Sequence, residues 1–271
     1  MRRVLALSSW VAAGHVGLSA AIPALQAVGA ETIGVPTVML SNHRAFPHCA
    51  GQPVPPAEID AMVGAVAANG WLAGLDAVLT GYMPSGSHAE AAARAVAAVR
   101  AASPGAQVVV DPVLGDDPKG LYVPEDAAEA VAALLVPEAD ALTPNRFELA
   151  RLTGLPAADL AGAAEAARSL VAARPGRRVI VTSPPIRPED TGALIAAPDG
   201  GATLHLTRRR EGAPNGGGDV VSALVAGGLG AGLAIGAVDA LIAASLGAPH
   251  VAFATARGWA EAEPVPGRLL D

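Results

Sequence analysis

The chain has 271 residues with a net charge of −7, and 52% of its residues are hydrophobic while only 3% are aromatic. No basic block is present, which argues against nucleic acid as a partner, and the densest basic cluster, Arg208–Arg210, is expected to be a solvated strand end. The single cysteine, Cys49, excludes an intrachain disulfide and a cysteine-based zinc site, which fits a reducing cytoplasm.

The first part of the chain is predicted to form two strands with a helix between them. The strands are expected over Val4–Ser8 and Glu31–Val35, and the helical pattern runs through 20–28. The polar and proline-containing segment Pro36–Pro56 that follows is expected to be irregular. Because an excursion of this length is uncommon in a compact domain unless it acts as a lid or a binding segment, we predict a flap there.

From residue 57 onward, helical and strand patterns alternate regularly. Helices are expected at about 57–69, 88–102, 125–135, 146–153 and 159–173, and strands at Asp76–Thr80, Val108–Val110, Ala139–Leu142 and Arg178–Val181. This alternation is typical of a doubly wound, mostly parallel sheet with helices on both faces. Two further runs, Ala193–Ala197 and Ala202–Thr207, predict an antiparallel hairpin at a sheet edge. The chain, 1–271, is therefore predicted to be a single α/β domain.

Three consecutive glycines, Gly216, Gly217 and Gly218, stand before Asp219 and a long apolar run. Glycine allows a turn that presents backbone N–H groups, and the run predicts a helix that begins near Gly218 or Asp219. A helix N-terminus carries about half a positive charge, so this segment can bind an anion. Asp219 could then act as a general base beside that anion. A plain glycine-rich loop with Asp219 as the helix N-cap explains the same residues.

The apolar run itself, Val220–Val238, is uncharged over nearly the length that spans a bilayer. Glycines at positions 227, 228, 230 and 232 interrupt it. Two buried helices joined by a glycine turn are therefore predicted, and a membrane span is not.

Small and polar residues gather where the predicted strands end. These residues are Ser9, Tyr82, Asp111, Thr143, Asn145, Thr182 and Ser183. Because ligands bind outside the carboxyl ends of the strands in open parallel sheets, a ligand site is predicted on that face. Asn145 and Glu148 share one face of a helix, where they could hold a hydrated magnesium ion or form an N-terminal capping arrangement. Together with the anion cradle and Asp219, they indicate phosphoryl transfer.

These residues, in their order along the chain, resemble the pyridoxal kinases of the ribokinase-like superfamily over nearly the whole sequence. The elements that carry the resemblance are Ser9 with Gly14-His15-Val16-Gly17, Ser41-Asn42-His43, Gly81-Tyr82, Asp111-Pro112-Val113-Leu114-Gly115, Thr143-Pro144-Asn145-Arg146-Phe147-Glu148 and Pro214-Asn215-Gly216-Gly217-Gly218-Asp219. The resemblance implies ATP-dependent phosphorylation of the 5′-hydroxyl of pyridoxal in vitamin B6 salvage, with pyridoxine and pyridoxamine as further candidate acceptors.

The resemblance also implies roles for individual residues. Asp219 would accept the hydroxyl proton, and Gly216, Gly217 and Gly218 would offer N–H groups to the transferred phosphoryl group. Asp111, Asn145 and Glu148 would position phosphates and Mg²⁺. The nucleotide site would be lined by Thr143, Thr182, Ser183 and Asn215. The vitamer would be held by Ser9 and Tyr82 and covered by the 36–56 flap with His43 and Arg44. The family further implies a cytoplasmic homodimer and makes K⁺ a candidate second ion.

Two departures from the family pattern fall in the expected substrate pocket. Many members have a polar pair such as Thr-Gln where this chain has Arg44-Ala45, and many carry Tyr where this chain has Ala13. A hydroxymethylpyrimidine or hydroxymethylpyrimidine phosphate kinase of the same superfamily, which shares the Asp-Pro-Val and glycine-rich elements, is an alternative. A non-catalytic vitamin-binding protein on the same scaffold is a second alternative, against which the retained Asp219 and its three glycines argue.

Overall fold

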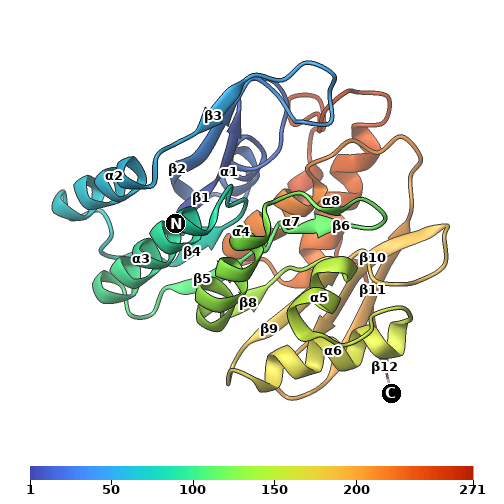
Figure 1. Cartoon of the computed structure of the whole chain (residues 1–271). Helices are drawn as coiled ribbons and strands as arrows, with labels where there is room; N and C mark the ends of the chain where they lie inside the picture. Colours follow the sequence, from blue (N-terminus) through green and yellow to red (C-terminus); the bar gives the residue numbers. More distant parts are fainter. Residues whose placement is uncertain (271) are drawn as a thin grey trace.

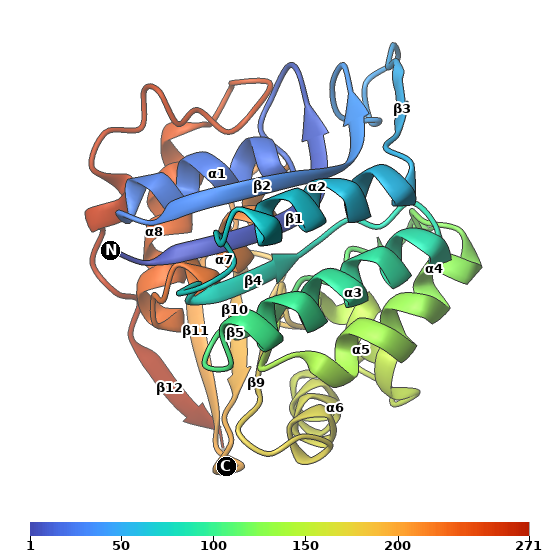
Figure 2. The ribbon, with the colours of Figure 1, turned by 90° about the vertical axis from the view of Figure 1, so that its left-hand side faces the viewer.

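The computed structural model describes residues 1–270, which form a ten-stranded sheet with helices packed on both faces (Figures 1 and 2). The strand order is β12-β11-β10-β9-β8-β5-β4-β1-β2-β3. The parallel part consists of β1 (Arg3–Val11), β2 (Glu31–Leu40), β4 (Ala77–Thr80), β5 (Gln107–Val110), β8 (Ala141–Leu142) and β9 (Arg178–Thr182). The predicted α/β class with a mostly parallel sheet is confirmed.

Antiparallel strands close both edges of the sheet. They are β10 (Asp190–Ala196), β11 (Ala202–Arg208) and β12 (Gly267–Leu270) at one edge and β3 (Gly51–Pro53) at the other. The predicted edge hairpin is thus present as β10 and β11. The short strand β12 was not predicted from the sequence, because its exposed residues carry no alternation of apolar and polar side chains.

Helices cover the two faces of the sheet and bury two separate apolar cores. The first face carries α2 (Pro56–Ala68), α3 (Gly86–Ala102), α4 (Glu125–Ala130), α5 (Arg146–Thr153) and α6 (Leu160–Ala172), and the second carries α1 (Leu18–Ala27), α7 (Gly217–Ala226) and α8 (Ala231–Ala244). Strand β1 contributes side chains to both cores, since Leu5 and Leu7 belong to the first while Val4 and Ala6 belong to the second. This period of two is what a strand buried on both faces requires.

The flap is more regular than the sequence predicted. Strand β2 continues to Leu40 and pairs with β3, so the irregular part of the flap is reduced to the loop 41–50 and the short link 54–55. The reason is a third, small apolar cluster, in which Val38 and Leu40 pack on Val11 of the neighbouring strand. Tertiary packing thus extends the sheet through a segment whose local sequence looked irregular.

Other predicted boundaries also differ in the structure, and β8 begins at Ala141 instead of Ala139. Strand β1 runs to Val11 with a register shift between Ser8 and Ser9, so Ser9 lies within the strand rather than after it. The helix expected over 125–135 is α-helical only to Ala130 and continues as a π-helix, η1 (Val131–Leu135), and a 3₁₀ turn, η2 (Val136–Glu138). Pro137 stands at the start of η2, and because a proline lacks a backbone N–H it cannot continue the regular α-helical hydrogen-bond ladder.

A small two-stranded hairpin, formed by β6 (Gly115–Asp116) and β7 (Gly120–Leu121), stands apart from the main sheet. A further 3₁₀ turn, η3 (Trp259–Glu261), packs on α8 near the end of the chain. The uncharged run is divided between α7 and α8, as predicted, and within residues 1–270 we find no helix whose length and apolar character would let it cross a bilayer.

Candidate active site

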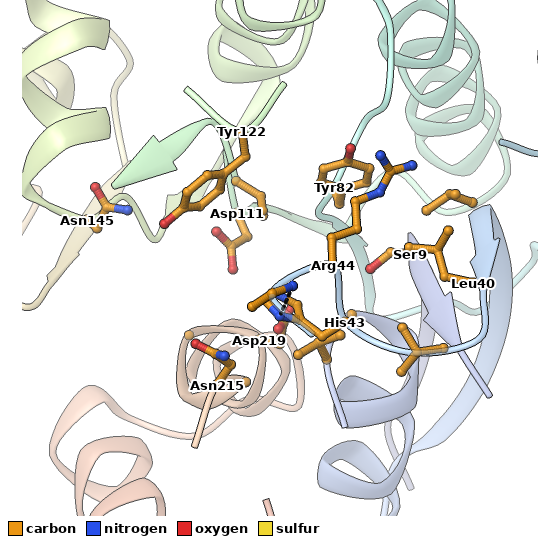
Figure 3. A pocket seen from close by; sticks show the side chains of 18 of the residues that line it. Ser9, Leu40, His43, Arg44, Tyr82, Asp111, Tyr122, Asn145, Asn215 and Asp219 are labelled. Atoms are coloured by element: carbon orange, nitrogen blue, oxygen red, sulfur yellow. Dashed lines mark hydrogen bonds between the residues drawn. The ribbon is translucent and has the colours of Figure 1, made fainter. Parts of the chain in front are cut away.

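A cavity of about 510 Å³ opens where the parallel strands end, between the flap and the N-terminus of α7 (Figure 3). It is lined by Ser9, Val11, Val16, Gly17, Val38, Leu40, His43, Arg44, Ala45, Tyr82, Asp111, Val113, Lys119, Tyr122, Thr143, Asn145, Glu148, Thr182, Asn215, Gly216, Gly218 and Asp219. The ligand site that the strand ends predicted therefore lies on the expected face of the sheet.

Two of the sequence-predicted site residues, Gly217 and Ser183, do not line this cavity. They line a second cavity of about 260 Å³, which shares Thr182 and Gly218 with the first. All the other predicted residues, from Ser9 to Asp219, lie on the first cavity. The two hollows thus meet at the glycine turn, and a ligand that occupies both would pass directly over the start of α7.

The arginines of the second cavity extend one expectation from the sequence. Arg208 ends β11 and Arg209 follows it, and both are exposed, as predicted for a solvated strand end; together with Arg210 they also line this cavity. Arg210 is half-buried and donates to Asp239 of α8 at 2.9 Å. This ion pair fixes the loop that leads into the glycine turn.

Helix α7 begins earlier than the sequence predicted, where a start near Gly218 or Asp219 was expected. The helix begins at Gly217, and its N-cap is Gly216 with φ of 110°. A Cβ at Gly216 would collide with the carbonyl oxygen of His15, so glycine is required there for both conformation and space. The alternative that Asp219 is the N-cap is wrong, because Asp219 lies in the first turn and makes no capping hydrogen bond.

Asp219 sits at a point where two helix N-termini converge. Gly17, the N-cap of α1, and Gly216, the N-cap of α7, both line the cavity beside it. Burial raises the pKa of Asp219 to about 6, while the backbone N–H of Gly17 opposes this shift. A carboxylate with this pKa is mostly ionised near neutral pH and is suited to accept a proton.

Asn145 and Glu148 form the capping box of α5. Glu148 donates its N–H to Asn145 Oδ1 at 2.9 Å, and Glu148 Oε2 accepts the N–H of Asn145 at 2.9 Å. Glu148 Oε1 also accepts the N–H of Leu114 at 2.8 Å. Despite these donors, burial raises the pKa of Glu148 to about 7. The capping interpretation of this pair is confirmed, and the carboxylate remains on the cavity wall.

Asp111 adds a third carboxyl group to this region. Burial raises its pKa well above the ordinary value, and the negative charges of Glu148 and Asp219 add to the effect. A buried carboxyl group that two other carboxylates repel forms an environment that a divalent cation would stabilise. Within residues 1–270, no group of three or more His, Cys, Asp or Glu side chains could hold a metal alone. These residues fit an Mg²⁺ that takes one or two carboxylates and completes its shell with phosphate and water oxygens.

Thr143 lines the same end of the cavity and has a buried hydroxyl group. Its Oγ1 finds no hydrogen-bond partner among the described residues, although the side chain is only 2% exposed. An unpartnered buried hydroxyl is costly unless a ligand satisfies it. Together with the half-buried Thr182 and the amide of Asn145, it marks this end of the cavity as polar.

The opposite end of the cavity is apolar, with Ser9 and Tyr82 among aliphatic side chains. The backbone of Tyr82 is fixed at both ends, since its N–H donates to Ser8 Oγ at 3.1 Å and its carbonyl accepts from Thr37 Oγ1 at 2.7 Å. In Figure 3, Arg44 lies toward Tyr82 while His43 lies toward Asp219. This end can accept a flat ring with a few polar substituents.

The flap loop is held over the cavity by its own side chains and by an aromatic contact. Asn42 Nδ2 donates to the carbonyl of His48 at 2.9 Å, and Phe46 packs edge-on against His250, with ring centroids 5.5 Å apart. Burial, followed by the positive charge of Lys119, lowers the pKa of His43. The neutral imidazole is therefore favoured at neutral pH.

The sequence did not single out Gly17, Lys119 or Tyr122 as site residues, although they line the cavity. Gly17 belongs to a motif that had been recognised, and its φ of 55° and its closeness to Ser9 explain why glycine stands there. Lys119 and Tyr122 reach the cavity only because the β6–β7 hairpin folds toward it, and the sequence carries no periodic signal for a hairpin this short.

The sequence matches known proteins over most of its length. Residues 12–244 match a protein family described as phosphomethylpyrimidine kinase. The pyridoxine/pyridoxal/pyridoxamine kinase of Bordetella avium is 40% identical over 222 residues, which cover 81% of this chain and 75% of that protein. A pyridoxal kinase of Corynebacterium diphtheriae is 37% identical over 226 residues, which cover 83% of this chain and 80% of that protein.

The structure also matches solved structures. A pyridoxal kinase from Leishmania donovani, in complex with ADP and pyridoxamine, superposes with a TM-score of 0.88 at 30% sequence identity and covers 100% of both chains. The similarity therefore extends through the whole architecture, including the antiparallel edges.

Proposed function

We propose that this chain, which belongs to the phosphomethylpyrimidine kinase family, transfers the γ-phosphoryl group of ATP to the 5′-hydroxyl of pyridoxal and gives pyridoxal 5′-phosphate. The observation that carries the proposal is the position of Asp219, which lines the main cavity next to Gly218, a residue that both cavities share, and beside two helix N-termini. The named activities of the relatives and the ADP and pyridoxamine in the Leishmania donovani structure support the choice of reactants.

The proposed mechanism uses the two ends of the main cavity for two substrates. The vitamer ring would lie at the apolar end near Ser9 and Tyr82, and the nucleotide phosphates near Thr143 and Asn145. Asp219 would accept the proton of the 5′-hydroxyl as the hydroxyl oxygen attacks phosphorus. The N–H groups of the α7 N-terminus would stabilise the negative charge of the transferred phosphoryl group. The flap would exclude water during this step.

Mg²⁺ belongs to this proposal as the ion that accompanies the nucleotide. When bound, it would neutralise phosphate charge and reduce the repulsion between substrate and protein carboxylates. Asp111 and Glu148 would hold it, directly or through water, and Asn145 would bind its water or the phosphates. K⁺ as a second ion and a cytoplasmic homodimer are further parts of the proposal, and light scattering on the purified chain would test the dimer.

The alternative substrate is hydroxymethylpyrimidine or its phosphate, which the name of the matched family supports. Purified chain would be incubated with ATP and, in parallel, with pyridoxal, pyridoxine, pyridoxamine or hydroxymethylpyrimidine, with and without Mg²⁺. We expect rapid, Mg²⁺-dependent phosphorylation of pyridoxal. A reaction with hydroxymethylpyrimidine alone would remove the substrate assignment and leave the kinase chemistry. No reaction with any acceptor, combined with tight vitamer binding, would favour the non-catalytic vitamin-binding alternative.

A further inference from the structure

Lys119 is the one lysine of the chain, and the site described above leaves it without a role. It lies in the turn between β6 and β7, and it lines the main cavity. Within residues 1–270 it forms no ion pair with an acidic side chain. An ammonium group that lines a cavity without a carboxylate partner is available to an anionic ligand.

The turn that carries Lys119 is fastened to the polar end of the cavity. Asn145 Nδ2 donates to the carbonyl of Gly115 at 2.7 Å, which ties β6 to the start of α5. Arg146 Nη2 donates to Asp117 Oδ2 at 2.6 Å on the other side of the turn. Both anchors come from the beginning of α5, so Lys119 is placed relative to the residues proposed to bind phosphates.

Lys119 also faces the flap across the cavity. Its positive charge contributes, after burial, to the lowered pKa of His43, so the two side chains are close enough to interact electrostatically. His43 lies toward Asp219, whereas the other flap cation, Arg44, lies toward Tyr82 (Figure 3). Arg44 thus lies at the ring end of the cavity, whereas Lys119 is within electrostatic reach of His43 and stands on a turn that is held by the start of α5.

The chemistry at this position requires a positive charge. The carboxyl groups of Asp111, Glu148 and Asp219 all face the cavity, and each would repel an incoming phosphoryl group when ionised. Helix N-termini supply only partial positive charges. A lysine has a full charge, three N–H donors and a flexible four-carbon stem, so its ammonium group can follow a group that moves between two oxygen atoms.

We propose that Lys119 binds the phosphoryl group while it is transferred, on the side of the cavity opposite the N-terminus of α7. This inference rests on the proposed kinase function. In the transfer, the bond between the γ-phosphorus and the β,γ-bridging oxygen of ATP breaks, and a bond forms between that phosphorus and the acceptor hydroxyl oxygen. The hydroxyl proton passes to Asp219, and the broken bond leaves its electron pair on ADP. Lys119 keeps its proton throughout and donates hydrogen bonds to the non-bridging oxygens of the phosphoryl group.

The test compares ligands that differ only in the phosphoryl group. Isothermal titration would measure the dissociation constants of ADP and of a non-hydrolysable ATP analogue, and then of pyridoxal and pyridoxal 5′-phosphate. The proteins would be the unmodified chain, Lys119→Met, Lys119→Arg and the control Arg94→Met. Arg94 is an exposed residue of α3 outside both cavities, and its replacement removes the same single charge. A thermal melt of each variant would establish that it is folded.

We expect Lys119→Met to raise the dissociation constants of the ATP analogue and of pyridoxal 5′-phosphate by roughly tenfold. This is the effect of losing one charge-assisted hydrogen bond. The dissociation constants of ADP and pyridoxal should change by less than about twofold, because these ligands lack the transferred phosphoryl group. Lys119→Arg should restore most of the affinity, since it keeps the charge. Arg94→Met should change none of the four constants.

Two results would overturn the proposal for Lys119. If Lys119→Met weakened the binding of ADP and of the ATP analogue equally, Lys119 would contact a part of the nucleotide other than the γ-phosphoryl group. If the binding of the analogue were unchanged, Lys119 would make no contact with the nucleotide. The nucleotide titrations need no vitamer, so they decide the role of Lys119 even if pyridoxal proves not to be the acceptor. An unmodified chain that binds neither nucleotide would overturn both this proposal and the kinase function.

Discussion

Asp219, Asp111 and Glu148 are carboxyl groups that the fold holds at an energetic disadvantage. In each case burial is the main cause of a raised pKa. A raised carboxyl pKa means that the charged form is less stable in the folded protein than in the unfolded chain. The active site is therefore expected to lower the stability of the empty protein at neutral pH, and substitutions there should separate activity from stability.

Replacing Asp219 with Asn should greatly slow turnover and stabilise the fold at alkaline pH. The contribution of the aspartate to stability is complete below about pH 4 and is lost as the pH rises through about 6, its folded-state pKa. A shift from 3.8 to about 6 corresponds to at most about 3 kcal/mol, and the partial exposure of Asp219 makes this an upper bound. We expect kcat to fall by about 10²–10⁴-fold.

Kinetics and thermal melts at pH 8 and pH 5 would check both halves of this prediction. The melting temperature of the Asn variant should exceed that of the unmodified chain at pH 8, and the difference should shrink at pH 5, where the aspartate is mostly protonated. Pyridoxal and ADP should still bind within a few-fold. Unchanged kcat would contradict the assignment of Asp219 as the base.

The acidic limb of the pH–rate profile should depend on Mg²⁺. Asp219, with a pKa of about 6, and Glu148, with a pKa of about 7, must be ionised to accept a proton and to hold a cation, so kcat/KM should fall as the pH drops below about 7. A cation favours the ionised carboxylates, so higher Mg²⁺ should move the limb to lower pH. Profiles recorded at constant ionic strength would show this shift, and a limb that stays fixed would argue that the carboxylates do not share the ion.

At the level of single residues, the sequence predicted most of the cavity lining because these residues follow parallel strands. Asp111, Thr143 and Thr182 stand at the ends of neighbouring strands, and strand ends meet at one edge of a sheet. Lys119 could not be found in this way, since a short hairpin outside the sheet brings it there. The roles of the individual residues stay predictions until variants are measured.

The glycine turn before α7 separates two reasons for which a chain uses glycine. Gly216 has a positive φ and no room for a Cβ, whereas a Cβ on Gly218 would meet open space. Replacing Gly216 with Ala should therefore lower the melting temperature, because both strain and collision destabilise the turn. Replacing Gly218 with Ala should leave the melting temperature unchanged or higher, since alanine favours the helix.

Activity should respond differently from stability in this pair. Gly218 lines the main cavity at its junction with the second, so a methyl group there would stand where the transferred phosphoryl group is proposed to pass. We expect Gly218→Ala to lower kcat by at least tenfold in a fully folded protein, as circular dichroism and steady-state kinetics would show. Normal activity of Gly218→Ala would contradict the proposed path of the phosphoryl group.

At the level of elements, periodicity located the helices and the buried strands but not the short or exposed ones. The π-helical turn η1 follows α4 without a change in composition that would mark it. The end of β2 and the pairing of β3 depend on Val11, which is distant in the sequence. Such features are decided by tertiary contacts, which a local pattern does not contain.

The whole molecule is organised by a sheet that both apolar cores share. Successive residues of β1, such as Val4 and Leu5, belong to different cores, and the same alternation occurs in β4 with Ala77 and Val78. Neither core can lose its packing without exposing strands that support the other. The ligand cavity lies at the end of these same strands, so binding energy is expected to stabilise the entire fold.

Calorimetric unfolding should therefore show one transition, as the prediction of a single domain over 1–271 requires. The calorimetric and van't Hoff enthalpies should agree, because the shared strands couple the two cores. A non-hydrolysable ATP analogue at 100 times its dissociation constant should add about 2.7 kcal/mol and move the whole transition up by several degrees. The same titration with Asp219→Asn, which keeps the nucleotide phosphate contacts, should give a similar shift. Two transitions, of which only one moves with nucleotide, would instead divide the chain into two domains.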